Sequence, residues 1–142
     1  TSNTKVYVKP NSGATTEDMN DHIKPAIRYK PDMFIIHTGT NDLNLNMGKE
    51  PIDIANEIIE LGMNAKSEEN DVAISELIIR NDELNSKAMK VNELLRRKCS
   101  TNDLGFIEHG NIKLQHLNHS GLHLNSAGNS ILSKNFVNYI NL

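Results

Sequence analysis

Three short segments combine residue types that could support a nucleophilic attack in which an oxyanion develops. Asn11-Ser12-Gly13-Ala14 contains a glycine, whose backbone N–H can approach a ligand closely and donate a hydrogen bond. Gly39-Thr40-Asn41-Asp42 contains an asparagine amide, which can supply two donors to a developing oxyanion. Residues 120–125 contain His123, which can act as a general base for a nucleophile within hydrogen-bond reach.

Each segment also has a plainer interpretation. Taken alone, the first is better explained by a simple turn and the histidine of the third by a surface position, whereas the second fits a helix cap or an Asx turn equally well. His109, His116, His119 and His123 form a cluster in the sequence, and a metal site could be drawn from the last three. However, Asn118 and Gly121 disfavour the helix that would align those rings, so we expect neither a metal nor another cofactor.

The elements that must position these segments alternate between strand and helix. Strands are predicted at residues 5–8, 33–38, 73–79 and 105–107. Helices are predicted after Thr15, from Pro51, from Leu84 to about Lys98, and after Ser126 as the N-cap. The predicted inward faces are Ile52, Ala55, Ile58, Ile59 and Met63 in the second helix, Leu84, Ala88, Val91 and Leu95 in the third, and Ile131, Leu132, Phe136 and Ile140 in the last.

This alternation predicts an α/β fold, a three-layer α/β/α sandwich with a parallel sheet. Ligands bind such sheets outside the carboxyl ends of the strands, and each of the three segments follows a predicted strand. The sequence therefore predicts that the three segments meet at one edge of the sheet.

Length and composition narrow the class of protein. The 142 residues suit one domain, and no run of 18 apolar residues predicts a membrane span. The net charge of -3 and the scattering of the 15 Lys and Arg residues argue against a nucleic-acid surface and favour a small-molecule partner. Cys99 is the only cysteine, which excludes an intramolecular disulfide and predicts an intracellular, cytoplasmic location.

Together, the three segments resemble the conserved blocks of SGNH hydrolases, the GDSL-like lipases and esterases. The glycine block is at Ser12-Gly13, the Gly-x-Asn-Asp block at Gly39 to Asp42, and the histidine block at Ser120 to His123. The resemblance spans residues 1–142 and implies a flavodoxin-like sheet. It also implies hydrolysis of a carboxylic or acetyl ester, with the Gly13 N–H and the Asn41 side chain as oxyanion donors and His123 as the base.

A narrower resemblance lies in the string from His116-Leu117-Asn118 through Gly128, which is similar to esterase-like domains of invertebrate retrotransposon-type open reading frames. It suggests a nucleic-acid accessory function in a mobile element. The charge of the chain does not support that function.

The chain departs from the SGNH pattern in two places. Gly-Asp-Ser, the family's nucleophile block, does not occur in it, and the resemblance places that block and the first strand upstream of Thr1. We therefore expect a partial domain in which the first strand is missing between residues 5–8 and 33–38, so that those two strands either close up or stay loose. The aspartate that the family has three residues before its histidine is Ser120 here, and a hydroxyl cannot stabilise an imidazolium as a carboxylate does.

Two functions consequently stay open. One is a serine-hydrolase domain that has no turnover as it stands, since Ser12 and Ser120 do not match the position of the family nucleophile. The other is a non-catalytic binding or assembly module that keeps the esterase fold. Ser120 and the absent block favour the module, whereas a Gly-Asp-Ser sequence upstream would favour the enzyme.

Overall fold

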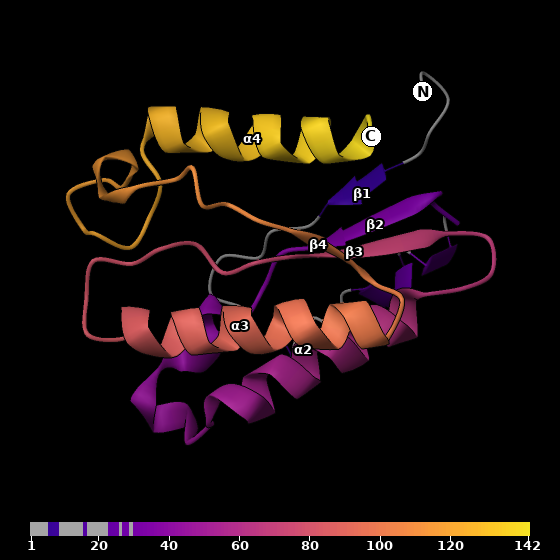
Figure 1. Ribbon diagram of the computed structural model, residues 1–142, viewed down its shortest axis with the longest axis horizontal. Helices are drawn as coiled ribbons and strands as arrows, with labels where there is room; N and C mark the ends of the chain where they lie inside the picture. Colours follow the sequence, from indigo (N-terminus) through magenta and orange to yellow (C-terminus); the bar gives the residue numbers. More distant parts are fainter. Residues whose placement is uncertain (1–5, 9–15, 17–22, 26, 29) are drawn as a thin grey trace.

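A computed structural model describes residues 6–8, 16, 23–25, 27–28 and 30–142 (Figure 1). Its strands are β1 (Val6–Val8), β2 (Met33–Ile36), β3 (Asp71–Ser75) and β4 (Gly105–Ile107). Its long helices are α2 (Pro51–Ala65), α3 (Asn85–Thr101) and α4 (Ser126–Ile140), and its short 3-10 helices are η1 (Thr40–Leu43), η2 (Leu45–Met47) and η3 (Leu114–His116).

The four strands form one parallel sheet in the order β1-β2-β3-β4. Figure 1 shows α2 and α3 covering one face of the sheet and α4 covering the other. The predicted three-layer α/β/α sandwich with a parallel sheet is therefore confirmed. In the described part of the chain, no helix is long and apolar enough to span a bilayer.

Alternate residues of the strands enter two separate cores. Phe34, Ile36 and Ile74 pack with α2 and α3 in the larger cluster, whereas Ile35 and Ala73 pack with α4 in the smaller one. Successive side chains of a strand point to opposite faces, and both faces are covered here, which explains the nearly continuous apolar run in β2.

The predicted third strand, residues 73–79, is shifted in the structure. β3 begins at Asp71 and ends at Ser75, so the predicted centre at residues 77–79 lies beyond the strand. The side chain of Asn92 in α3 explains the early end, because its amide accepts from Leu77 N at 2.7 Å and donates to Leu77 O at 2.9 Å. A buried side chain thus replaces the neighbouring strand as the partner of this backbone. β2 similarly ends at Ile36 instead of residue 38.

The helices agree with the prediction in position and differ in detail. In α2, Ile52 and Met63 are exposed, and the buried positions are Ile54, Ala55, Ile58, Ile59, Leu61, Gly62 and Ala65. In α3, Leu84 is the N-cap and Ala88, Val91, Leu95 and Cys99 are buried. Thr15, after which the first helix was predicted, lies outside the described residues.

The strands expected to flank a missing first strand pair directly with each other. Val6 is opposite Met33 and Val8 is opposite Ile35 in a parallel ladder. The sequence left open whether these two strands close up or stay loose. In the structure they close up.

Candidate functional site

The loops that follow β2, β3 and β4 meet at the carboxyl edge of the sheet, where α3 and α4 begin (Figure 1). Arg80, in the loop after β3, lies with Nη1 3.5 Å from the carbonyl oxygen of Thr40 in the loop after β2. The next residue, Asn81, donates its backbone N–H to Gly121 O at 2.9 Å in the loop after β4. The loop of Asn41 and the loop of His123 are thus connected through residues 80 and 81.

The loop after β2 turns sharply at Gly39, whose φ is 112°. A Cβ atom there would also lie 2.8 Å from Ile58 Cδ1, so the position requires glycine. The turn leads directly into η1, in which Asn41 is half-buried. Its role as an oxyanion donor stays a prediction. Gly13 and Ser12, the other predicted positions in this part of the site, lie outside the described residues.

The carboxylate of Asp42 is fully buried and anchors this loop. Its Oδ2 accepts from the backbone N of Thr16 at 2.9 Å and from the Thr16 hydroxyl at 2.8 Å, and its Oδ1 lies 2.7 Å from Lys49 Nζ. Lys49 also contacts Glu57 at 2.8 Å. Burial lowers the pKa of Lys49, but the hydrogen bonds to the two carboxylates outweigh burial and hold that pKa above its usual value.

Asp42 therefore joins the loop of Asn41 to the segment that directly follows the predicted glycine block. Sequence reasoning missed this role, because it treated Asp42 only as part of a motif or cap. Thr16 and Asp42 are 26 residues apart, and no periodic pattern connects them.

The loop after β4 is closed by its own backbone. Leu117 and Leu124 form an isolated antiparallel bridge, and Asn118 N donates to His123 O at 2.7 Å. The side chain of His123 is exposed, and its role as the base stays a prediction.

Ser120 bonds within this loop. Its hydroxyl donates to Asn118 Oδ1, and its oxygen accepts from Leu122 N at 3.2 Å. These are the bonds of a short polar residue that shapes a turn. None of these bonds connects Ser120 to His123. That Ser120 takes the place of the triad aspartate therefore stays a prediction.

The entrance of α4 follows immediately, and Asn125, not Ser126, is its N-cap. Its Oδ1 accepts from Gly128 N at 2.9 Å, while its Nδ2 donates to the carbonyl oxygens of Gln115 and Leu117 at 2.9 and 3.3 Å. Gly128 is buried against this loop, and a Cβ atom there would lie 2.4 Å from the backbone oxygen of His116.

Gly128→Ala is accordingly expected to lower the free energy of unfolding by about 1–3 kcal/mol, as overpacking does. Helix propensity alone would give the opposite sign, since alanine is favoured over glycine by about 1 kcal/mol. Urea unfolding checks the sign, with Ser130→Ala at an exposed position of α4 as the control. A Gly128→Ala variant as stable as the original chain would contradict the packing argument.

The histidines of the alternative metal site and its neighbour His109 do not form a metal-binding group in the described structure. His109 is buried and bonds Ser75, while His119 and His123 are exposed. The described residues contain no group of three or more His, Cys, Asp or Glu side chains that could hold a metal. Cys99 is buried, and burial raises the pKa of its thiol to about 12, which suits a core residue and not a nucleophile.

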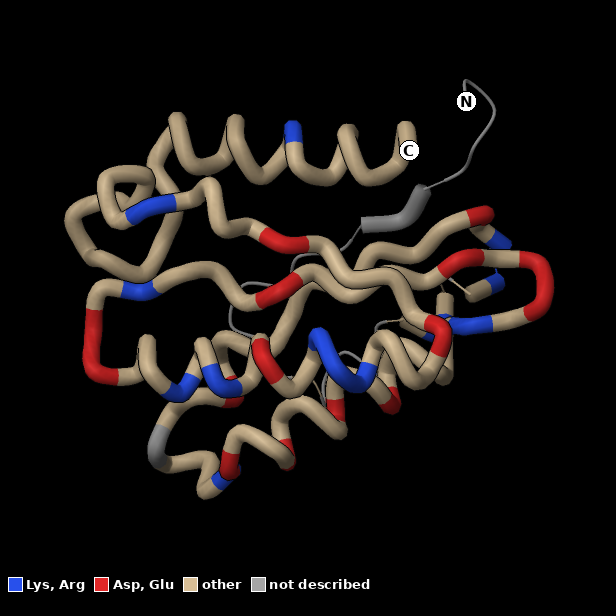
Figure 2. The backbone as a smooth tube through the Cα atoms, viewed as in Figure 1, with Lys and Arg blue, Asp and Glu red and all other residues tan. Residues whose placement is uncertain are grey.

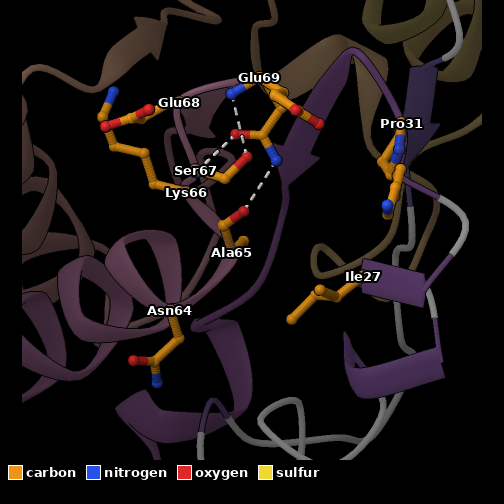
Figure 3. A pocket seen from close by; sticks show the side chains of 10 residues that line it. Ile27, Pro31, Asn64, Ala65, Lys66, Ser67, Glu68 and Glu69 are labelled. Atoms are coloured by element: carbon orange, nitrogen blue, oxygen red, sulfur yellow. Dashed lines mark hydrogen bonds between the residues drawn. The ribbon is translucent and has the colours of Figure 1, made fainter.

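A cavity of about 400 Å³ opens at the opposite edge of the sheet (Figure 3). It is lined by residues that precede β2, such as Lys30 and Pro31, by the last two residues of α2, and by residues 66–70 of the loop that precedes β3. Of the predicted site residues that the structure describes, Asn41, Ser120 and His123, none lines it. The carboxyl edge of the sheet therefore remains the candidate site.

Comparison with known proteins identifies the fold. No protein-family model matches the sequence, and no curated protein matches it. Among solved structures, the chain is similar to a lipase/acylhydrolase from Enterococcus faecalis, with a TM-score of 0.76 and 19% identity over 90% of this chain and 71% of that one.

Two further likenesses agree. A member of the lipolytic G-D-S-L family from Veillonella parvula has a TM-score of 0.74 and 15% identity over 89% of this chain and 75% of that one. A carbohydrate esterase of family 3 from Talaromyces cellulolyticus has a TM-score of 0.78 and 17% identity over 92% of this chain and 68% of that one. The chain thus has the fold of GDSL-type lipases, acylhydrolases and esterases, as the resemblance implied, and spans roughly 70% of their length. None of these likenesses bears on the mobile-element resemblance, which stays a prediction.

Proposed function

We propose that this chain, with the fold of GDSL-type acylhydrolases and esterases, is an SGNH hydrolase domain that acts on a small-molecule carboxylic or acetyl ester. The observation that carries the proposal is the meeting of the Asn41 loop and the His123 loop at the carboxyl edge of the parallel sheet. Residues 1–142 would form the part of the domain that holds the base and two of the oxyanion donors.

In the proposed reaction, a serine hydroxyl attacks the ester carbonyl carbon while His123 takes its proton. The Asn41 amide and the Gly13 N–H stabilise the negative oxygen of the tetrahedral intermediate. His123 then gives the proton to the departing alcohol, and a water molecule, activated by the same histidine, releases the acid. The exposed position of His123 and the half-buried position of Asn41 suit these roles.

The proposal predicts no measurable ester turnover by these 142 residues alone, because they contain no Gly-Asp-Ser nucleophile block. The assay is hydrolysis of p-nitrophenyl acetate by the purified chain, compared with buffer and with a His123→Ala variant. Turnover above buffer that disappears in His123→Ala would show that another nucleophile operates in the chain.

The second candidate is a non-catalytic module with the same fold. Ser120 favours it, because its hydroxyl is engaged with Asn118 and Leu122 and offers no negative charge to His123. Placing a strand that carries Gly-Asp-Ser ahead of the chain separates the two candidates. Turnover that requires His123 supports the enzyme, whereas a folded and inert protein supports the module.

A small-molecule partner is also supported by the distribution of charge. Figure 2 shows basic residues of α3 beside acidic residues of α2, so that neither sign dominates this side of the molecule. A nucleic-acid surface would instead need clustered positive charge. The proposal includes a reducing, cytoplasmic compartment, for which the single buried Cys99 is the supporting observation.

A further inference from the structure

A second polar cluster lies between the sheet and α4, and the proposed reaction does not use it. Ser75 Oγ, at the end of β3, lies 2.8 Å from His37 Nδ1 and 2.6 Å from His109 Nε2. Asn135 of α4 continues the chain of bonds, with Nδ2 3.0 Å from His109 Nδ1. We call these four residues the His37–Asn135 chain.

With the Asn135 amide oriented as the structure has it, one set of hydrogens satisfies the chain of bonds. The Asn135 amide nitrogen can only donate, so His109 Nδ1 accepts, and His109 Nε2 carries the hydrogen that it donates to Ser75. The single hydroxyl hydrogen of Ser75 is then given to His37 Nδ1. Both imidazoles are neutral in this arrangement. A second hydrogen on His109 would face the Asn135 N–H, and one on His37 would deprive the Ser75 hydroxyl of its acceptor.

The surroundings give a positive charge little support. Phe136 of α4 packs edge-on against both rings, with centroids 6.0 Å from His37 and 5.6 Å from His109. In the described part of the chain, no carboxylate hydrogen-bonds with either ring. Glu76, next to Ser75, accepts from the backbone N of His109 at 2.7 Å.

Among the residues that the structure describes, the other charged groups on elements packed against the cluster are paired elsewhere or exposed. From the loop after β4, Glu108 pairs with Arg96 of α3 at 2.8 Å. From α4, Lys134 is exposed beside Asn135. β2 adds no charged side chain within its bounds.

We propose that the His37–Asn135 chain is an acid-sensitive latch, which holds α4 on the sheet while both imidazoles are neutral and releases it when they take up protons. Release would also loosen the His123 loop, because Asn125 at the entrance of α4 bonds Gln115 and Leu117. The latch needs no nucleophile, so it stands whether or not the proposed function is correct.

The direction of the pH effect follows from the two pKa values. Burial lowers the pKa of His37 to about 4, and burial together with His37 lowers the pKa of His109 to about 4. When α4 is released, both rings return to a pKa of about 6.5. Above a pH of about 6.5 both rings are neutral whether or not α4 is released, so protons do not favour release. As the pH falls from about 6.5 to about 4, the released state binds more protons, and its population rises by up to about tenfold per pH unit for each ring.

Native-state amide hydrogen exchange between pH 7 and pH 4.5, corrected for intrinsic rates, tests the latch. Opening of α4 is expected to increase at least tenfold more than opening of α3 over this range. Asn135→Asp places a carboxylate beside His109 Nδ1, which stabilises the protonated ring, and is expected to reduce that increase by about tenfold or more. Asn138→Asp makes the same chemical change at an exposed position of α4 and is expected to have no such effect.

Two results would overturn the proposal. One is α4 exchange that follows α3 exchange at every pH, or that responds equally to the two variants. The other comes from the unaltered chain and does not depend on any variant folding. Ring ¹⁵N chemical shifts are expected to show both His37 and His109 neutral at pH 5.5, and protonated rings at that pH would show that the cluster tolerates the charge.

Discussion

Replacing Asp42 with alanine is expected to lower the free energy of unfolding by about 3 kcal/mol, a cost typical of removing one partner from a buried ion pair. The variant leaves the Thr16 N–H, the Thr16 hydroxyl and one contact of Lys49 without their acceptor. We expect a value near the lower end of the usual range, because Lys49 keeps Glu57 and is partly exposed. The measurement is equilibrium urea unfolding at pH 7.

Glu57→Gln is the matched control for that experiment. It removes the other carboxylate that contacts Lys49, but this one is more than a third exposed, so the expected loss is under about 1 kcal/mol. If both variants lower the free energy of unfolding by the same amount, the burial of Asp42 does not make its contacts more stabilising than those of Glu57. In that case the carboxylate would not be the anchor of the loop that carries Asn41.

In a form of the domain that carries a Gly-Asp-Ser strand, Ser120→Asp is expected to raise kcat by up to about 10⁴-fold, or roughly 5 kcal/mol of transition-state stabilisation. A carboxylate three residues before His123 would hold the imidazole in one tautomer and stabilise its charged form. An aspartate oxygen can still accept from Leu122 N, as the Ser120 hydroxyl does, so the turn should survive. Because aspartate cannot donate to Asn118, its second oxygen can turn towards His123.

The comparison for this experiment is the same form of the domain with Ser120 unaltered, and His123→Ala is the control. A rise in kcat that depends on His123 supports the predicted triad geometry. An unchanged or lower kcat, with the near-UV circular dichroism spectrum intact, would mean that His123 is oriented by another group or is not the base.

Local pattern was enough to predict most elements of this fold. The apolar run in β2, Pro51 at the start of α2 and the apolar spacing in α3 each depend on interactions between residues close in sequence. Alternation of strand and helix then leaves few topologies, because parallel strands need crossover helices. The three segments were expected at one edge for the same reason. The bonds from Arg80 and Asn81 show that two of them, Gly39 to Asp42 and residues 120–125, meet there, whereas Asn11 to Ala14 lies outside the described residues.

Contacts between distant residues were decided only by the tertiary structure. Periodicity could not show that Asn92 ends β3, because that amide reaches Leu77 only when α3 packs on the sheet. Nor could it pair Asp42 with Thr16. Ile35 and Ala73 are opposite each other in the sheet, and His37 and Ser75 each follow that pair by two residues. The strand register would therefore have predicted that His37 and Ser75 are neighbours. One sequence, however, does not specify the register. A buried polar group must find a partner wherever the packed chain brings one, and that partner is set by three-dimensional proximity instead of sequence spacing.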